Sequence, residues 1–274
     1  MPKDKKPQLR VDFDPSKTRA IVTTGIRRAT AFLSLALHDL DSRNDVRFIV
    51  EAPMKYVFWP DEIPDETLAQ VRSEFRAWAI GSCFRELEQF YGRFLDDVGK
   101  IIELAEAHGK AVKVGTNFGK KYRDNTNSAS KQKTICEIIG SDDHFYELNS
   151  ISLARNCMTH NLGHVRQPRD CNTDAQDALV LKWFAMDLVM TRGGEDRVLD
   201  GPMNVSDLPG EGAAAVVIKA VTREVRFEPG QRVDLSGQQL SEICFFFAAL
   251  ADKTMSGLMG YLGAKKIPIG PRAI

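Results

Sequence analysis

The feature that most constrains this 274-residue chain is the apolar periodicity between Pro64 and Gly109. Apolar residues recur there at three- and four-residue spacings, and proline and glycine stand just outside the two ends, as is typical of helix termini. The pattern predicts a helix over 65–108, and Gly81 is the position at which it can break into two. Since so long a helix must bury its apolar stripe against other helices, we expect a mainly α-helical, up-and-down bundle.

The other elements are predicted from the same kind of pattern. Ser16 opens a helix over 16–40, residues 134–139 form a short helix, and residues 175–191 form another. Ser141 is the expected N-cap of a helix over 141–163 that Gly163 ends, and Ser236 opens the last helix. Residues 48–59 are a connection or a short edge strand, and 192–212 are a loop. Strand-like alternation over 213–221 and 224–235, around Pro229-Gly230, predicts a small β-hairpin.

These elements suggest three parts. A basic tail over 1–15 is loosely attached, a helical bundle spans 16–192, and a loop, the β-hairpin and a closing C-terminal helix over 193–274 pack on the bundle.

Composition excludes several classes of protein. Lys and Arg together number 37, as do Asp and Glu, so any contact with nucleic acid must be local. The five cysteines form neither a CxxC motif nor a Cys/His cluster, which argues against a zinc site and against a disulfide framework. The N-terminus lacks a signal-peptide pattern, and no apolar run approaches the roughly 20 residues that span a bilayer. We therefore expect a cytoplasmic protein with reduced thiols, no cofactor, no bound metal and no membrane contact.

The candidate active centre is the run Arg155-Asn156-Cys157-Met158-Thr159-His160. At about 100° per residue, Leu148, Ile151, Ala154, Met158 and Leu162 share the core-facing side of the helix. Asn156 and His160 lie on the opposite side, with Gly163 beside them. Around the helix axis, Arg155 lies roughly 140° from His160, so the two side chains of one helix do not reach the same site. A second copy of the helix across a two-fold axis would complete the site, or Arg155 would curl past Asn156.

The motif resembles the signature of the HEPN (higher eukaryotes and prokaryotes nucleotide-binding) superfamily. In a helical domain, Arg155 and Asn156 are followed by His160, four residues after Asn156, and then by Asn161. The resemblance covers about two-thirds of the chain. The hairpin from Val225 to Val233 with its closing helix also resembles a C-terminal ending of some uncharacterised bacterial members. The family implies a metal-independent endoribonuclease that acts as a homodimer, often in antiviral defence or as a toxin with an antitoxin partner.

The residue types suit that chemistry. A histidine imidazole titrates near neutral pH, so His160 can take the proton of an RNA 2′-hydroxyl or protonate the leaving oxygen. Arg155 is a forked donor for charge that develops at phosphorus, and Asn156 would hold the imidazole or a phosphate oxygen. DNA lacks the attacking hydroxyl. The basic stretch 110–133 and His164 are candidates for RNA contacts, which are expected at Lys113, Lys120, Lys121, Arg123 and His164.

Other interpretations of the same residues stay open. Arg155 can pair with an acid such as Glu147 or Glu137 while His160 only caps the helix end. His160 and His164 have the spacing of a metal pair but lack an acidic partner, Cys157 suits core packing better than nucleophilic attack, and the basic stretch can be a solvated loop. The chain as a whole can also be a noncatalytic HEPN-like module that binds a nucleotide or a protein, or a sensor or scaffold dimer.

Overall fold

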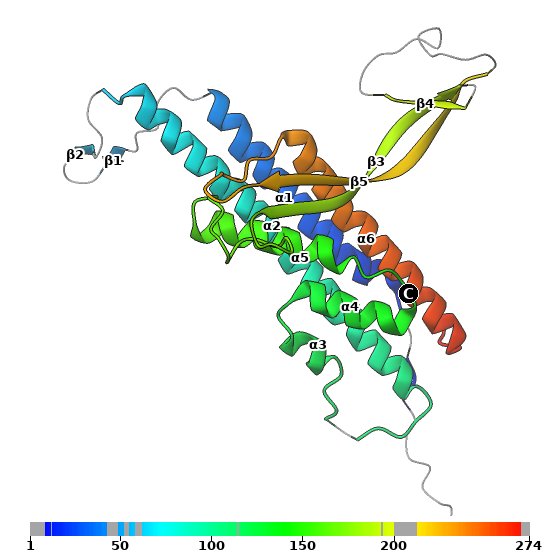
Figure 1. The fold of residues 1–274 in the computed structure, drawn as a ribbon. Coiled ribbons are helices and arrows are strands. Elements are labelled where there is room, and N and C mark those ends of the chain that lie inside the picture. Colours follow the sequence, from blue (N-terminus) through cyan, green and yellow to red (C-terminus); the bar gives the residue numbers. More distant parts are fainter. Residues whose placement is uncertain are drawn as a thin grey trace, which may run out of the picture.

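The structure is a computed structural model that describes residues 9–11, 13–42, 49–51, 55–57, 62–113, 115–192, 194–199 and 213–269. This part is mostly helical and contains α1 (Pro15–Ser42), α2 (Asp65–Ala107), α3 (Lys120–Asp124), α4 (Ser128–Ile139), α5 (Phe145–His160) and α6 (Gly237–Ala264). Its strands are β1 (Ile49–Glu51), β2 (Lys55–Val57), β3 (Leu179–Arg192), β4 (Glu195–Val198) and β5 (Ala215–Phe227). β1 and β2 pair with each other, and the larger sheet is antiparallel in the order β4-β3-β5 (Figure 1).

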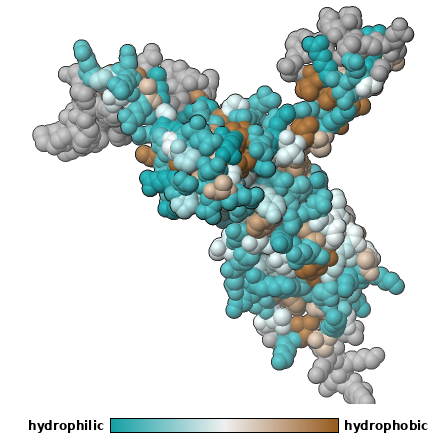
Figure 2. All heavy atoms as spheres, viewed as in Figure 1, coloured by the Kyte–Doolittle hydropathy of each residue, from teal (hydrophilic) through white to brown (hydrophobic). Residues whose placement is uncertain are grey.

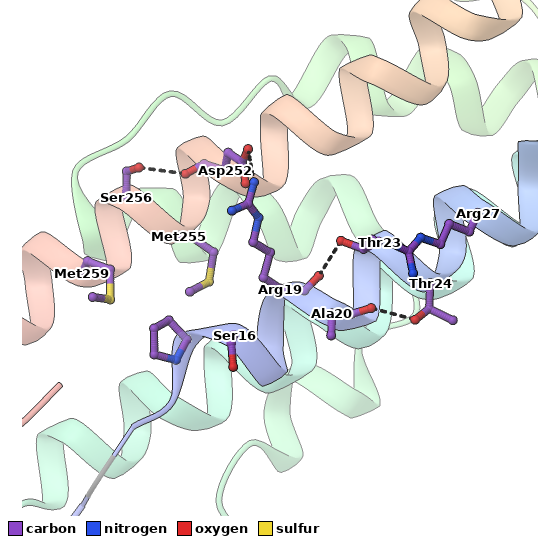
Figure 3. Close-up of a pocket in the computed structure, with 11 residues that line it drawn as sticks. Ser16, Arg19, Ala20, Thr23, Thr24, Arg27, Asp252, Met255, Ser256 and Met259 are labelled. Atoms are coloured by element: carbon purple, nitrogen blue, oxygen red, sulfur yellow. Dashed lines mark hydrogen bonds and ion pairs between the residues drawn. The ribbon is translucent and has the colours of Figure 1, made fainter. Parts of the chain in front are cut away.

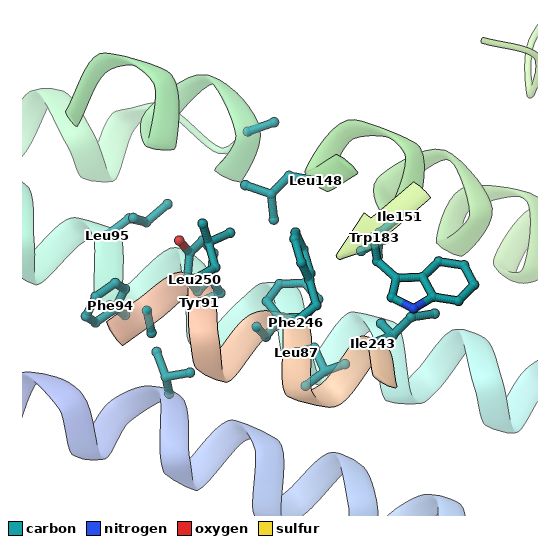
Figure 4. Close-up of a cluster of buried hydrophobic side chains, with 14 of the residues drawn as sticks. Leu87, Tyr91, Phe94, Leu95, Leu148, Ile151, Trp183, Ile243, Phe246 and Leu250 are labelled. Carbon is teal, nitrogen blue, oxygen red and sulfur yellow. The ribbon is translucent and has the colours of Figure 1, made fainter. Parts of the chain in front are cut away.

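The long helix α2 is the element against which the other helices pack. α1, α4, α5 and α6 all contact it, and the core between them is lined by aromatic and aliphatic side chains from α2, α5, α6 and β3 (Figure 4). Tyr91, Phe246 and Phe247 are fully buried in this core. The helix predicted over 65–108 is thus confirmed, but the break at Gly81 is not. Gly81 stays helical because α5 packs closely here, and a Cβ on it would lie 3.0 Å from the Cβ of Met158.

The crossing of α1 over α2 depends on Gly25. A Cβ at this position would lie 2.3 Å from the Cβ of Phe90, so the two helices would have to separate. We expect Gly25→Ala to lower the free energy of unfolding by about 1–3 kcal/mol, as overpacking usually does. Urea denaturation with an unchanged slope would measure it.

The matched control for this prediction is Gly260→Ala in α6, where a Cβ would meet nothing within 4 Å. Alanine is the better helix former there and should raise stability by roughly 0.5–1 kcal/mol. If Gly25→Ala stabilises the protein to the same extent, the close crossing of α1 and α2 is wrong.

The helix predicted over 175–191 is wrong, because Leu179–Arg192 is strand β3. It pairs with β5 from Leu179↔Phe227 to Thr191↔Ala215. A dense apolar run of this length suits a buried strand as well as a helix. Here pairing with β5 stabilises the strand. The hairpin predicted over 213–235 is corrected too. Residues 215–227, which include parts of both predicted strands, form the single strand β5, and the chain at Pro229-Gly230 turns back to hydrogen-bond with residues 163–165 instead.

Two further boundaries differ from expectation. Within the tail predicted over 1–15, Val11 and Phe13 are buried, the amide of Leu9 donates to the carbonyl of Lys110, and the remaining tail residues lie mostly outside the described part. The boundary drawn at 192/193 falls at the end of β3, whose partner β5 lies on the other side of it. A continuous hydrophobic core runs from Val11 to Ile267, so the bundle and the C-terminal part share one core.

Helix starts are only partly predicted. α6 begins as expected, with Ser236 and Gln239 forming a reciprocal capping box. α5 begins at Phe145 rather than at 141, because His144 adopts a left-handed conformation and the carboxylate of Asp143 accepts the amide of Phe145. α4 begins at Ser128, six residues before the short helix predicted at 134–139, and Asn127 caps it.

Two described helices, over Pro15–Leu37 and Gly237–Ala264, are long and apolar enough to cross a membrane by length and composition alone. The sequence analysis expected no continuous apolar run of about 20 residues, and these two helices pass on their mean hydropathy although charged residues interrupt them. Half of the apolar window of α6 is buried inside the protein, as is common for a core helix. α1 is less buried and exposes Arg19, Arg27 and Arg28.

Candidate functional site

The motif lies in the last two turns of α5, oriented as its periodicity predicts. Ile151, Ala154 and Met158 are buried against the core, Asn156 is half-buried, and His160 is exposed at the last helical position. Leu162 was expected on the core side but is 54% exposed, because the helix has ended and Leu162 adopts a positive φ of 52°. The structure therefore presents Asn156 and His160 on the side of α5 away from the core.

Arg155 faces the neighbouring helix α2 rather than His160. Its Nε lies 3.1 Å from Oε2 of Glu88, whose side chain is 9% exposed, while 31% of the arginine side chain remains exposed. The hydroxyl of Ser152 donates to the other carboxylate oxygen. Burial raises the pKa of Glu88, and Arg155 and Ser152 oppose that rise. The ion pair expected with Glu147 or Glu137 is thus made with Glu88, and Glu147 lies near His144 instead.

Cys157 is not placed for nucleophilic chemistry. Its side chain is fully buried, and desolvation, followed by the nearby Asp170 carboxylate, raises the pKa of the thiol to about 12. Packing in the core is therefore its role, in agreement with the sequence interpretation.

The loop after His160 is tied back to the end of α5. The side-chain amide of Asn161 donates to Oδ2 of Asp170 at 2.6 Å, the amide of Arg166 donates to the same oxygen at 2.9 Å, and both Asn161 and Asp170 are buried. Arg166 and Arg169 are exposed on the loop that this closure holds, close in sequence to His160. Asn161 of the motif thus holds the loop against the end of α5. The two arginines are candidate phosphate contacts that the sequence analysis missed.

Residues 163–165 are held by the chain around Pro229-Gly230. The amide of Val165 donates to the carbonyl of Gln231, the amide of Val233 donates to the carbonyl of Gly163, and Nδ1 of His164 lies 3.1 Å from the carbonyl oxygen of Gly230. Gly163 has a positive φ of 84°, and a Cβ on it would lie 3.2 Å from Arg232. His164 is therefore exposed near His160 but partly engaged by the backbone.

The predicted lysine contacts lie elsewhere. Lys121 approaches Glu103 of α2 at 3.7 Å, and Arg123 donates to the carbonyl of Phe118, so these side chains belong to the α3 region. α5 crosses α2 near Gly81 instead, and Glu103 lies ~33 Å further along α2 at about 1.5 Å per residue. A single chain therefore does not bring Lys113, Lys120, Lys121 and Arg123 to His160.

The groove between α1 and α6 does not include the motif residues, and they belong to no metal-ligating cluster. Within the described ranges, no group of three or more His, Cys, Asp or Glu side chains has the arrangement of a metal site. A groove of about 1050 Å³ lies between α1 and α6, where Arg19 pairs with Asp252 at 2.9 Å (Figure 3). Thr24 and Ser256 in this groove donate to carbonyls of their own helices, so their hydroxyl protons are already used.

Comparisons with protein-family models, with curated proteins and with solved structures find no match to this chain. The candidate site is therefore interpreted from its own residues.

Proposed function

We propose that this protein is a metal-independent endoribonuclease of the HEPN type, in which α1, α2, α4, α5 and α6 form the up-and-down bundle. The observation that carries the proposal is the end of α5, where exposed His160 is the last helical residue and exposed Arg166 and Arg169 follow on the loop that Asp170 ties to Asn161. An exposed imidazole, followed by two exposed arginines on the adjoining loop, suits a phosphodiester substrate. We place the activity in the cytosol, in a defence or toxin system.

The arrangement of Arg155 supports a site completed by a second chain. Its ion pair with Glu88 uses Nε, so the terminal nitrogens are the atoms that can reach toward solvent. His160 lies on another side of the helix, and one chain does not join the two groups. In the proposed homodimer, two α5 helices pack across a two-fold axis, and each His160 meets the arginines of the other chain.

The chemistry assigned to these residues is a transesterification within RNA. The 2′-oxygen attacks the adjacent phosphorus, the bond from phosphorus to the 5′-oxygen breaks, and the products are a 2′,3′-cyclic phosphate and a 5′-hydroxyl. His160 of one or both chains transfers the protons, and Arg155, Arg166 and Arg169 stabilise the negative charge at phosphorus. Asn156 orients the imidazole or a phosphate oxygen.

The test is cleavage without metal. Purified protein is incubated with single-stranded and structured RNA in excess chelator, and the ends are identified by mass spectrometry. Cyclic-phosphate ends are expected, and DNA of the same sequence should stay intact because it lacks the 2′-hydroxyl. Intact RNA in every incubation, or equal cleavage of the DNA, would show the proposal to be wrong.

A second candidate function is a noncatalytic HEPN-like module that binds a nucleotide or a protein partner such as an antitoxin. The Arg155–Glu88 ion pair favours it, because a buried carboxylate gives this arginine a structural reason to be present. This alternative predicts that substitutions at Asn156 and His160 change binding while RNA stays intact.

A further inference from the structure

Three aromatic side chains gather on α1 and α2. The ring centroids of Phe32 and Trp78 lie 5.5 Å apart, and those of Phe75 and Trp78 lie 5.4 Å apart. Trp78 is 52% exposed and Phe75 is 40% exposed, whereas the surface of the helical body is mainly hydrophilic in Figure 2. Aromatic side chains that are exposed and in contact with one another, rather than scattered singly, are typical of an interaction site.

The exposed part of α2 lies between the side that contacts α1 and the side that contacts α5. Glu86 faces α1, where it pairs with Arg28 at 2.7 Å, and Glu88 faces α5, where it pairs with Arg155 at 3.1 Å. At about 100° per residue, every exposed residue of α2 between positions 75 and 93 falls between these two sides. We define the α2 strip as these five residues, Phe75, Trp78, Arg85, Gln89 and Arg93.

The α2 strip carries positive charge and no acid. Arg85 and Arg93 form no ion pair with a residue that the structure describes. Arg93 lies over the ring of Phe90, 5.1 Å from its centroid, so its N–H donors remain at the edge of the guanidinium. The acids of α2 nearest to the strip are already engaged, Glu74 with Gln70, Glu86 with Arg28, Glu88 with Arg155 and Asp96 with Lys131. Cations beside exposed aromatic rings suit a polymer that offers both phosphates and flat bases.

The α2 strip runs beside the end of α5 that carries the proposed active site. A Cβ on Gly81 would lie 3.8 Å from Oγ1 of Thr159, and a Cβ on Gly163 would lie 3.3 Å from the Cβ of Ala77. Trp78 is on the same turn of α2 as these two contacts, which flank the last residue of α5. A strand bound at Trp78 is therefore held beside the end of α5.

We propose that the α2 strip binds single-stranded RNA, with one base stacked on Trp78 and phosphates held by Arg85 and Arg93. Every base has a flat face that can stack on a tryptophan, and arginine supplies forked donors for phosphate oxygens. From Trp78 to Arg93 the strip spans about 22 Å, which accommodates several nucleotides. Bases in a duplex are already stacked and paired, so the strip selects unpaired RNA. The inference rests on the proposed function for the cleavage that follows, and binding is measured without cleavage.

The test is binding of a fluorescein-labelled 2′-O-methyl RNA, which lacks the attacking hydroxyl and stays uncut. By fluorescence anisotropy, the parent protein should bind the single strand more tightly than the same strand annealed to its complement. Trp78→Ala should raise the Kd about tenfold, and Trp78→Phe should raise it by less because an aromatic ring is kept. Arg85→Ala should reduce the slope of log K against log salt by about 0.7, the contribution of one phosphate contact. Phe245→Ala on α6, where Phe245 is 43% exposed and outside the strip, is the matched control and should leave the Kd unchanged.

The outcomes separate this inference from the proposed function. A Trp78→Ala protein that is folded by circular dichroism and binds as tightly as the parent overturns the inference, even if the parent cleaves RNA. So does equal affinity for the single strand and the duplex, or a parent protein that binds neither. If binding depends on Trp78 but unmodified RNA stays intact in the cleavage test, the α2 strip is supported and the nuclease is wrong.

Discussion

Replacing His160 by alanine is expected to slow RNA cleavage by about 10²- to 10⁴-fold, the range that one general acid or base contributes. Stability should change by no more than about 0.5 kcal/mol, because the side chain is exposed at the last position of α5. A large loss of rate with the melting temperature retained separates a chemical role from a structural one. The measurement is the single-turnover rate constant on one RNA, in chelator, beside a thermal melt.

The matched control is the neighbouring exposed residue. The hydroxyl of Thr159 donates to the carbonyl of Arg155 at 2.8 Å, within the helix, so Thr159→Ala should keep the parent rate. If His160→Ala cleaves as fast as the parent, the assignment of proton transfer to His160 fails, and cleavage must be traced to another group or to a contaminant.

The sequence predicts long helices well because their period repeats many times. The stretch over 65–108 and the capped start at Ser236 both appear in the structure, and the side of α5 that carries His160 follows from phasing alone. Segment 179–192 was missed because a continuous apolar run has no distinctive period. Its identity as a strand depends on residues 215–227, which a local pattern does not include.

The environment of the candidate site was harder to predict than its residues. Arg155 pairs with Glu88, which is remote in sequence, and any of several acids satisfied the local pattern equally well. The loop that carries Arg166 and Arg169 is tied to Asn161, the residue after His160, only because Asp170 closes it. The lysines of 110–133 looked suitable by charge, yet the length of α2 separates them from the motif. These distances and pairings depend on contacts between different helices, which the periodicity of one helix does not predict.

The second large effect, on the free energy of unfolding, is expected when Arg155 is replaced by alanine. The substitution removes the cation beside Glu88 and leaves the buried carboxylate with the Ser152 hydroxyl as its hydrogen-bond donor. Removing one member of a buried pair is costly, and partial exposure of the arginine reduces the cost, so we expect a loss of about 2–4 kcal/mol at neutral pH. Cleavage should fall too, so the rate must be compared where the variant is fully folded.

The loss should depend on pH in one direction. Burial already raises the pKa of Glu88 above its ordinary value near 4.5, and removing Arg155 raises this pKa further. A carboxyl group with a raised pKa in the folded state binds its proton more tightly there. The protonated Glu88 carboxyl therefore stabilises the folded state fully at pH values below the pKa of the unfolded chain. This stabilisation is lost as pH rises through the pKa of the folded protein. The stability difference between Arg155→Ala and the parent should be small near pH 4.5 and should grow toward neutral pH.

A double substitution tests whether the cost comes from the unpaired carboxylate. Glu88→Gln removes the buried charge while keeping the shape, so Glu88→Gln with Arg155→Met should recover most of the stability lost in Arg155→Ala, and the pH dependence of the difference should disappear. Urea denaturation at several pH values measures both effects. If the double variant stays as unstable as Arg155→Ala, the loss arises from packing of the arginine stem rather than from Glu88. If the folded double variant still cleaves RNA at the parent rate, Arg155 serves the α2–α5 contact alone.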